Sequence, residues 1–262
     1  MDGEGWKKHA SLIVEKNGVA TLAIRDAGRL NILSTPVVTA LVRAISDIER
    51  RSDIRVLVLR GDGDEAFVAG ADIKEMAELN QTSAMVFIEN LRQLCDGVRL
   101  LPKPVIARIP GWCLGGGMEL ALACDIRIAS ANAKMGMPEI KVGIPSIIHA
   151  ALLPRLVGKA RASWLLMTGE IADAAEALSY GLADRVVAVG DLDKEVARVA
   201  DMMAGFGSQV LAQQKRLLRE WEDEPLDKSI QNGVAEFGSA FNTGEPQKYM
   251  DEFVREKKKG KQ

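Results

Sequence analysis

Residues 103–130, which read KPVIARIPGWCLGGGMELALACDIRIAS, show the alternation of strand and helix that organises the chain. Branched apolar residues at 104–111 predict a buried strand that ends in glycine. Three glycines at 115–117 then lead into a helix expected near 116–123, and DIRIAS at 125–130 predicts the next strand. Two strands joined by a helix are typical of a crossover unit in an α/β fold.

The same alternation extends toward the N-terminus. SLIVEK and VATLAIR flank Asn17-Gly18, a strong hairpin signal, so we expect an antiparallel pair between residues 10 and 26. Apolar residues at three- and four-residue spacing predict a helix over 35–51. The run IRVLVLRG fits a buried strand, followed by a loop at 61–70 and by helical character from 72 to 101.

Beyond about residue 145, helical patterns dominate, apart from the strand-like RVVAV at 185–189. The fold class predicted is therefore α/β with a helical C-terminal portion. We expect a core over residues 1–194 and a helical C-terminal region over 195–262, although no linker separates them.

The composition excludes several classes of function. Lys and Arg number 34 against 36 Asp and Glu, so no basic excess favours nucleic acid or an anionic membrane. No apolar run approaches the roughly 18 residues of a membrane span, and the first residues lack a signal-peptide pattern. Three cysteines without a C-x-x-C pair and two histidines predict no metal site and a reducing compartment, most simply the cytoplasm.

Two segments place small residues just before a helix: FVAGADIKEM at 67–76 and GWCLGGGMELA at 111–121. Free backbone N–H groups at a helix N-terminus favour negative charge. Two such helix starts facing one pocket would each supply an N–H to a developing oxyanion, as a thioester site requires. A tight loop or close helix packing explains either segment equally well. The spacing matches neither a P-loop nor a dinucleotide fingerprint.

Two carboxylates occur in apolar surroundings. Glu119 lies within GGGMELALA, and Glu139 lies within MGMPEIKVGIP. An unpaired buried charge is costly, so each is either part of a structural ion pair or held for proton transfer. Together with the two donor segments, they favour acid/base chemistry.

At these residues the chain resembles the enoyl-CoA hydratase/isomerase, or crotonase, superfamily. The likeness runs from about residue 12 to 255 and includes FVAGADIKEM, KPVIARIPGWCLGGGMELALACDIRIAS and MGMPEIKVGIP. It implies a spiral of ββα units with a helical C-terminal region used in trimerisation, commonly as a dimer of trimers. It also implies an acyl-CoA thioester substrate and no metal or redox cofactor.

Roles carry over from the resemblance position by position. The implied oxyanion donors are the backbone N–H groups of Ala71 and Gly116, and the implied catalytic acids are Glu119, at the attacking water, and Glu139, at the Cα proton. Implied substrate and CoA contacts are Arg25, Ala27, Leu30, Ala69, Asp72, Ile73, Gly115, Met135, Ser146, Phe237 and Lys257. For Met135 and neighbouring Met137, core packing is the alternative, and for the basic C-terminal run it is a solvated helix end.

Because both glutamates are present, the resemblance favours hydration of a 2-enoyl-CoA. The alternatives are a double-bond isomerase using Glu139 alone, another crotonase-type acyl-CoA reaction, and a non-catalytic CoA-binding assembly subunit. The chain departs from the family pattern in GIPSIIHAALLPRL, where Ser146 stands near a familiar glycine and His149 follows. His149 either touches substrate or has a structural role. DAGRLNILS near residue 30 also departs, which bears on the nucleotide contacts.

Overall fold

The fold begins with an N-terminal hairpin. In the computed structural model, which describes residues 5–259, β1 (Ala10–Val14) pairs antiparallel with β2 (Val19–Ile24). Gly18 in the turn has φ +87°, a conformation that glycine adopts without strain. Helix α1 (Thr35–Arg50) then leads to β3 (Val56–Arg60), which pairs in parallel with β2. The predicted hairpin, helix and strand are confirmed.

Successive pairs of strands supply two sheets. In the pairs β3-β4, β5-β6 and β7-β8, the first strand enters a sheet of order β1-β2-β3-β5-β7-β10 and the second enters a sheet of order β4-β6-β8-β9. Strands β1, β2 and β10 also belong to the first sheet, and β9 belongs to the second. The strands not yet defined are β4 (Ala66–Val68), β5 (Val105–Ile109), β6 (Trp112–Leu114), β7 (Ile126–Ser130), β8 (Lys134–Gly136), β9 (Ile171–Asp173) and β10 (Arg185–Val187). Helical segments follow each pair, so the predicted α/β spiral of ββα units is confirmed.

Glycine permits the sharp corner between the two strands of a pair. A Cβ atom on Gly61, directly after β3, would lie 2.4 Å from the carbonyl oxygen of Phe67. A Cβ atom on Gly111, between β5 and β6, would lie 2.0 Å from the carbonyl oxygen of Glu65. Neither corner therefore accommodates a side chain, which explains why both predicted strands end in glycine.

Several predicted elements are corrected by the structure. The loop expected at 61–70 contains β4, and β6, β8 and β9 were not predicted at all. Each of these strands has only three residues, too few to show an alternating pattern. The helix expected over 72–101 is divided into α2 (Ile73–Ala77) and α3 (Gln81–Leu100), because Asn80 and Ser83 form a capping box that starts a new helix.

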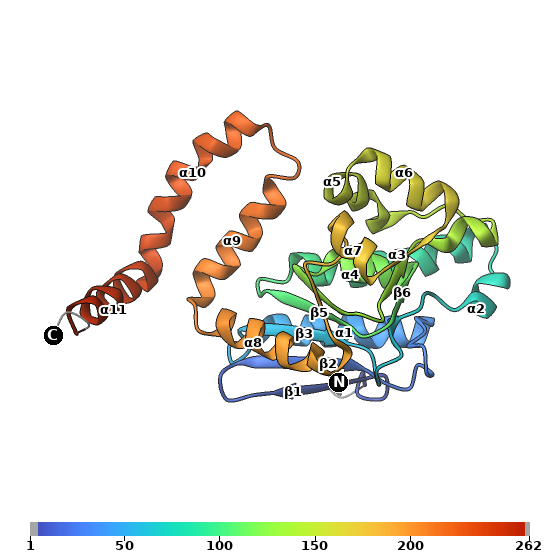
Figure 1. The fold of residues 1–262 in the computed structure, drawn as a ribbon, viewed down its shortest axis with the longest axis horizontal. Helices are drawn as coiled ribbons and strands as arrows, with labels where there is room; N and C mark the ends of the chain where they lie inside the picture. Colours follow the sequence, from blue (N-terminus) through green and yellow to red (C-terminus); the bar gives the residue numbers. More distant parts are fainter. Residues whose placement is uncertain (1–4, 260–262) are drawn as a thin grey trace.

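Helices α4 (Gly116–Ala123) and α8 (Leu192–Ala204) pack against the sheets (Figure 1). Helix α4 is buried along its whole length, and α8 packs its apolar face on residues of β3, β5 and β7. The other segments are 3-10 helices η1 (Pro138–Val142), η2 (Ile148–Leu152), η3 (Val189–Asp191) and η4 (Phe241–Thr243), and helices α5 (Leu153–Val157), α6 (Lys159–Thr168) and α7 (Ala174–Tyr180).

Helices α9 (Ser208–Glu220), α10 (Leu226–Ala240) and α11 (Glu245–Lys259) complete the chain. Figure 1 shows them extending away from the body, on the side opposite α2. The predicted division after residue 194 lies within α8, and as a domain boundary it stays a prediction. Among residues 5–259, no helix is both long and apolar enough to cross a membrane.

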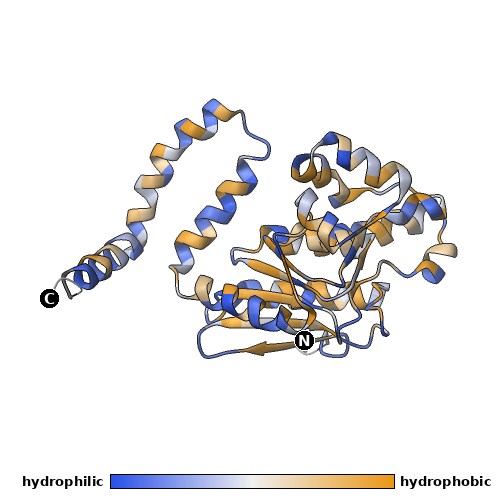
Figure 2. Ribbon diagram, viewed as in Figure 1, coloured by the Kyte–Doolittle hydropathy of each residue, from blue (hydrophilic) through white to orange (hydrophobic). Residues whose placement is uncertain are grey.

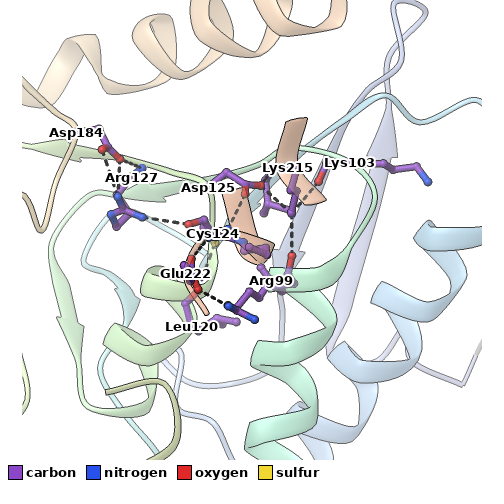
Figure 3. Close-up of polar contacts among 12 residues, drawn as sticks. Arg99, Lys103, Leu120, Cys124, Asp125, Arg127, Asp184, Lys215 and Glu222 are labelled. Carbon is purple, nitrogen blue, oxygen red and sulfur yellow. Dashed lines mark hydrogen bonds and ion pairs between the residues drawn. The ribbon is translucent and has the colours of Figure 1, made fainter. Parts of the chain in front are cut away.

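A buried ion pair attaches α9 to the core (Figure 3). The ammonium group of Lys215, which is 5% exposed, lies 2.8 Å from the carboxylate of Asp125 and donates to the carbonyl oxygens of Val98 and Lys103, each at 3.0 Å. Burial lowers the pKa of Lys215, while the charge of Asp125 opposes that shift. The hydrogen bonds compensate for the removal of this charge from water.

We expect Lys215→Met to lower the free energy of unfolding by about 3 kcal/mol, because it leaves two buried carbonyl groups without a donor and removes a charge partner of Asp125. Urea denaturation measures the change. Arg155→Met, which removes an exposed ion pair with Asp223, is the control and should change stability by less than about 1 kcal/mol. Equal losses in the two variants would contradict the importance of the buried pair.

Candidate active site

Two backbone N–H groups lie close together where the two small-residue segments meet. Leu33 donates to the carbonyl of Gly70 and accepts from the amide of Asp72, so the Ala71 amide between them takes no part in this bridge. Gly116 begins α4, where the first N–H groups have no acceptor within the helix. A Cβ atom on Gly116 would lie 3.9 Å from the Ala71 nitrogen. The structure therefore brings both predicted donors together.

The three glycines before and within α4 have little space around them. A Cβ atom on Gly117 would lie 2.1 Å from the carbonyl oxygen of Val68, and one on Gly116 would lie 2.9 Å from the side chain of Leu91. Gly115 has φ +52°, which disfavours other residues. The alternative of close helix packing therefore holds as well, because packing and exposed donors occur at the same residues.

Glu119, in the first turn of α4, is buried. It is 3% exposed, and its Oε1 accepts a hydrogen bond from the Ala150 amide at 3.1 Å. Burial raises the pKa of Glu119 to about 8, the amide of Ala150 opposes this shift, and the charge of Glu139 adds to it. No cation within the described residues forms an ion pair with Glu119, so the structure favours proton transfer over a structural ion pair.

Glu139 reaches the same place from η1. Its Oε2 accepts a hydrogen bond from the Ser146 hydroxyl at 2.8 Å. Its Oε1 lies beside Gly115, where an added Cβ atom would be only 2.9 Å away. The second carboxylate is therefore next to the start of the helix that carries the first.

A cavity of about 670 Å³ contains these groups. Its wall includes Ala71, Gly116, Glu119 and Glu139, and it is otherwise largely apolar. Further wall residues come from α3 and from the segment after η1, among them Ala84, Phe87, Ile88, Leu91, Ile144 and Ile147. An apolar cavity with a few convergent polar groups is typical of a small-molecule site.

The other residues predicted to contact substrate divide among the cavity wall, a helix cap and the hydrophobic core. Ala69, Ile73 and Gly115 line the cavity. Asp72 instead caps α2, because its carboxylate accepts from the amides of Lys74 and Glu75. Met135 and Met137 are both fully buried in the hydrophobic core, and neither is part of the cavity wall. The core interpretation of Met135 therefore replaces the predicted acyl contact, because its side chain packs among buried residues of the core.

The predicted nucleotide-side residues lie beside the cavity but outside its wall. Leu30 accepts from the amide of Ala69 through its carbonyl oxygen, and Ala27 accepts from Ile32. The side chain of Arg25 lies 3.7 Å from Asp62. These contacts hold the loop at residues 25–32 against residues 62–69, which precede the Ala71 donor.

Two predicted contacts lie on the C-terminal helices. Phe237 on α10 is exposed and packs edge-on against Phe241, and Lys257 on α11 lies over the ring of Phe253. Neither contributes to the cavity wall of its own chain. Within one chain, the structure does not bring them to the site.

His149 is buried behind the cavity instead of lining it. Its Nε2 lies 3.2 Å from Oδ1 of Asp96 on α3, and burial lowers the pKa of the imidazole. Its Nδ1 has no hydrogen-bond partner among the described residues. This arrangement favours the structural interpretation over contact with substrate.

The sequence did not lead us to predict that α3 provides part of the cavity wall. Ala84, Phe87, Ile88 and Leu91 recur at three- and four-residue spacing, the signal of one apolar helix face. That signal does not distinguish a face on the core from a face on a cavity, so only the fold identifies its role.

The profile of the family described as enoyl-CoA hydratase/isomerase matches residues 14–261. The chain belongs to the enoyl-CoA hydratase/isomerase family. Among solved members, the enoyl-CoA hydratase from Bacillus anthracis superposes with a TM-score of 0.90 at 31% identity, covering 95% of this chain and 96% of that one.

Curated relatives of the enoyl-CoA hydratase/isomerase family have similar lengths. The short-chain-enoyl-CoA hydratase of Clostridium acetobutylicum is 34% identical over 250 residues, covering 95% of this chain and 96% of that protein. The crotonyl-CoA hydratase of Syntrophomonas wolfei is 33% identical over 252 residues, covering 95% and 97%. The likeness therefore includes the C-terminal helices as well as the two sheets.

The raised pKa of Glu119 predicts a pH-dependent stability. An unfolded glutamate ionises near pH 4.5, whereas Glu119 in the folded protein keeps its proton to about pH 8. Between these values the folded protein binds more protons, so its stability falls as pH rises. The Glu119→Gln variant has no such proton to lose. As pH rises between these two values, the free energy of unfolding of the variant should therefore increase relative to that of the parent protein, by up to roughly 1.4 kcal/mol per pH unit.

Urea unfolding at pH 5 and pH 8.5 measures this difference. Glu49→Gln, which alters an exposed carboxylate on α1, is the matched control and should give the same difference at both pH values. If Glu119→Gln also gives a constant difference, burial does not hold the proton on Glu119.

Proposed function

We propose that the protein hydrates 2-enoyl-CoA thioesters, adding water across the carbon–carbon double bond next to the thioester. The observation that carries the proposal is the convergence of Glu119, Glu139 and the amides of Ala71 and Gly116 on one cavity. The hydratase relatives described above support this choice within the family.

The two amides act on the thioester carbonyl. As the nucleophile adds at Cβ, electron density moves through Cα to the carbonyl oxygen. Preorganised N–H groups stabilise this developing oxyanion, and they need not reorient as the charge develops. The positive end of α4 adds to the effect at Gly116.

The two glutamates act on the water and on Cα. The reactive form is the one in which Glu119 is ionised and Glu139 carries a proton, a minority form at neutral pH because burial raises the pKa of Glu119 to about 8. The water oxygen bonds to Cβ as one of its protons passes to Glu119, and Cα receives the proton of Glu139. Transfer of one proton between the carboxyl groups restores both, so the sum of the steps is addition of one water. Because the groups share this water, their protons belong to the pair. A carboxyl group with a pKa near neutral pH releases and accepts protons readily.

The reaction leaves the overall oxidation state of the substrate unchanged, so the proposal requires no redox cofactor, and the two amides perform the polarisation that a metal would otherwise supply. The apolar wall from α3, with Ile144 and Ile147, supports an apolar acyl group. The three buried free cysteines are consistent with a reducing compartment such as the cytoplasm.

We also propose assembly as a trimer or a dimer of trimers, with the C-terminal helices between copies. These helices expose large apolar side chains: Leu226, Ile230, Val234, Phe237, Phe253 and Val254. Figure 2 shows apolar residues recurring along them. Because Phe237 and Lys257 lie away from their own cavity, we infer that any contact they make with CoA is in a neighbouring copy.

Hydration is measured by the loss of absorbance of the conjugated double bond of crotonyl-CoA. We expect Glu119→Gln and Glu139→Gln each to lower kcat by on the order of 10²–10⁴, the usual contribution of a positioned acid or base. The control Glu49→Gln should keep the parent rate, because its side chain lies on the exposed face of α1.

Conversion of a 3-enoyl-CoA separates hydration from isomerisation. An isomerase that uses Glu139 alone should retain its rate in Glu119→Gln. Retention of that rate, together with no absorbance loss from crotonyl-CoA or from branched and aromatic enoyl-CoAs, would favour isomerisation over the proposed hydration.

A further inference from the structure

The segment 146–150, between η1 and α5, makes a hydrogen bond to each glutamate of the site. The hydroxyl of Ser146 donates to Oε2 of Glu139 at 2.8 Å. The amide of Ala150 donates to Oε1 of Glu119 at 3.1 Å. One short stretch of chain therefore contacts both carboxyl groups.

At Glu139, the contact with Ser146 leaves the other carboxyl oxygen available. Among the described residues, no donor reaches Oε1 of Glu139, which lies next to Gly115, where an added Cβ atom would be 2.9 Å away. Gly115 directly precedes the Gly116 amide. The available oxygen of Glu139 is thus the one beside the proposed oxyanion donors, and the oxygen held by Ser146 is the other.

We propose that Ser146 is a positioning residue, whose hydroxyl fixes the rotation of the Glu139 carboxyl group so that Oε1 exchanges the proton at Cα. The inference rests on the proposed function and adds to it a residue that contacts the acid, not the substrate. Ser146 does not line the cavity, although its neighbours Pro145 and Ile147 do.

The backbone of the segment is itself firmly held. Ile148 has φ +41°, a region that β-branched residues rarely adopt and that persists only where surrounding contacts impose it. Next to it, buried His149 contacts Asp96 on α3. The segment therefore provides a fixed base from which the Ser146 hydroxyl orients Glu139, which is what a positioning role requires.

The step that depends on Ser146 is separable from the addition of water. With a saturated acyl-CoA, the Cα–H bond breaks, the proton passes to Oε1 of Glu139, and the electron pair moves into the thioester as an enolate. Return of a proton to Cα reverses every change. In D₂O, the proton on Glu139 exchanges with solvent before it returns, so a deuteron is delivered to Cα and its incorporation reports this step without Cβ chemistry.

The experiment compares Ser146→Ala and Ser146→Thr with the full-length parent protein. We measure kcat and KM with crotonyl-CoA, deuterium exchange at Cα of butyryl-CoA, and Tm. Ser46→Ala is the control, since that hydroxyl lies on α1 and accepts a hydrogen bond from Arg50 of the same helix.

We expect Ser146→Ala to lower kcat and the exchange rate by the same factor, roughly 10-fold or more, as for loss of a hydrogen bond to a charged group. KM and Tm should stay near the parent values, and Ser146→Thr should recover most of both rates because it restores the hydroxyl. In a Glu139→Gln background, Ser146→Ala should have little further effect, because the group that it orients no longer transfers the proton.

Parent-like hydration and exchange in Ser146→Ala would overturn the inference. So would a loss that appears in KM or Tm, or one of the same size in the Glu139→Gln background, since a merely structural role produces these changes. A parent protein that neither hydrates crotonyl-CoA nor exchanges Cα protons would instead contradict the proposed function itself.

Discussion

The site depends on the close approach of the start of α4 to its neighbours. Gly115, Gly116 and Gly117 lie against Glu139, Leu91 and Val68 respectively, each with less than 3 Å for an added Cβ atom. Because no side chain separates these elements, the first N–H of α4 comes near the Ala71 amide. The same approach places Glu119, one turn into the helix, in the cavity that Glu139 also lines.

A fully buried helix that carries a carboxyl group has to be held at both ends. At its start, the Ala150 amide contacts Glu119. At its end, the guanidinium of Arg127 donates to the carbonyl of Cys124 at 3.0 Å, and the next residue, Asp125, is the partner of Lys215 on α9 (Figure 3). The attachment of the C-terminal helices and the placement of α4 therefore share one polar network.

The departures from the family pattern after Glu139 have a common physical meaning. Ser146 holds one oxygen of Glu139, and His149 contacts Asp96 next to the amide that holds Glu119. The Ser146 side chain, which stands near a familiar glycine, thus contacts Glu139 from outside the cavity wall, whereas the His149 side chain contacts α3. The acyl group would then meet the apolar side chains of Ile144 and Ile147.

The amino-acid sequence by itself determined the elements that carry a local signal. The Asn17-Gly18 hairpin, the amphipathic helix α1 and the branched apolar strands of the larger sheet follow from spacing of side chains along a few residues. The glycine corners and the carboxylates at 119 and 139 were also visible, as was the likeness to a family whose motifs recur in the same order.

Tertiary structure decided what depends on contacts between distant residues. Strands β4, β6, β8 and β9 have three residues each, so pairing with one another specifies them. Met135 packs in the core and Asp72 caps a helix, so neither side chain lines the cavity. The hydroxyl of Ser146 and the raised pKa of Glu119 likewise arise only from folding, since hydrogen-bond geometry and burial are properties of the folded surroundings, not of a residue's type.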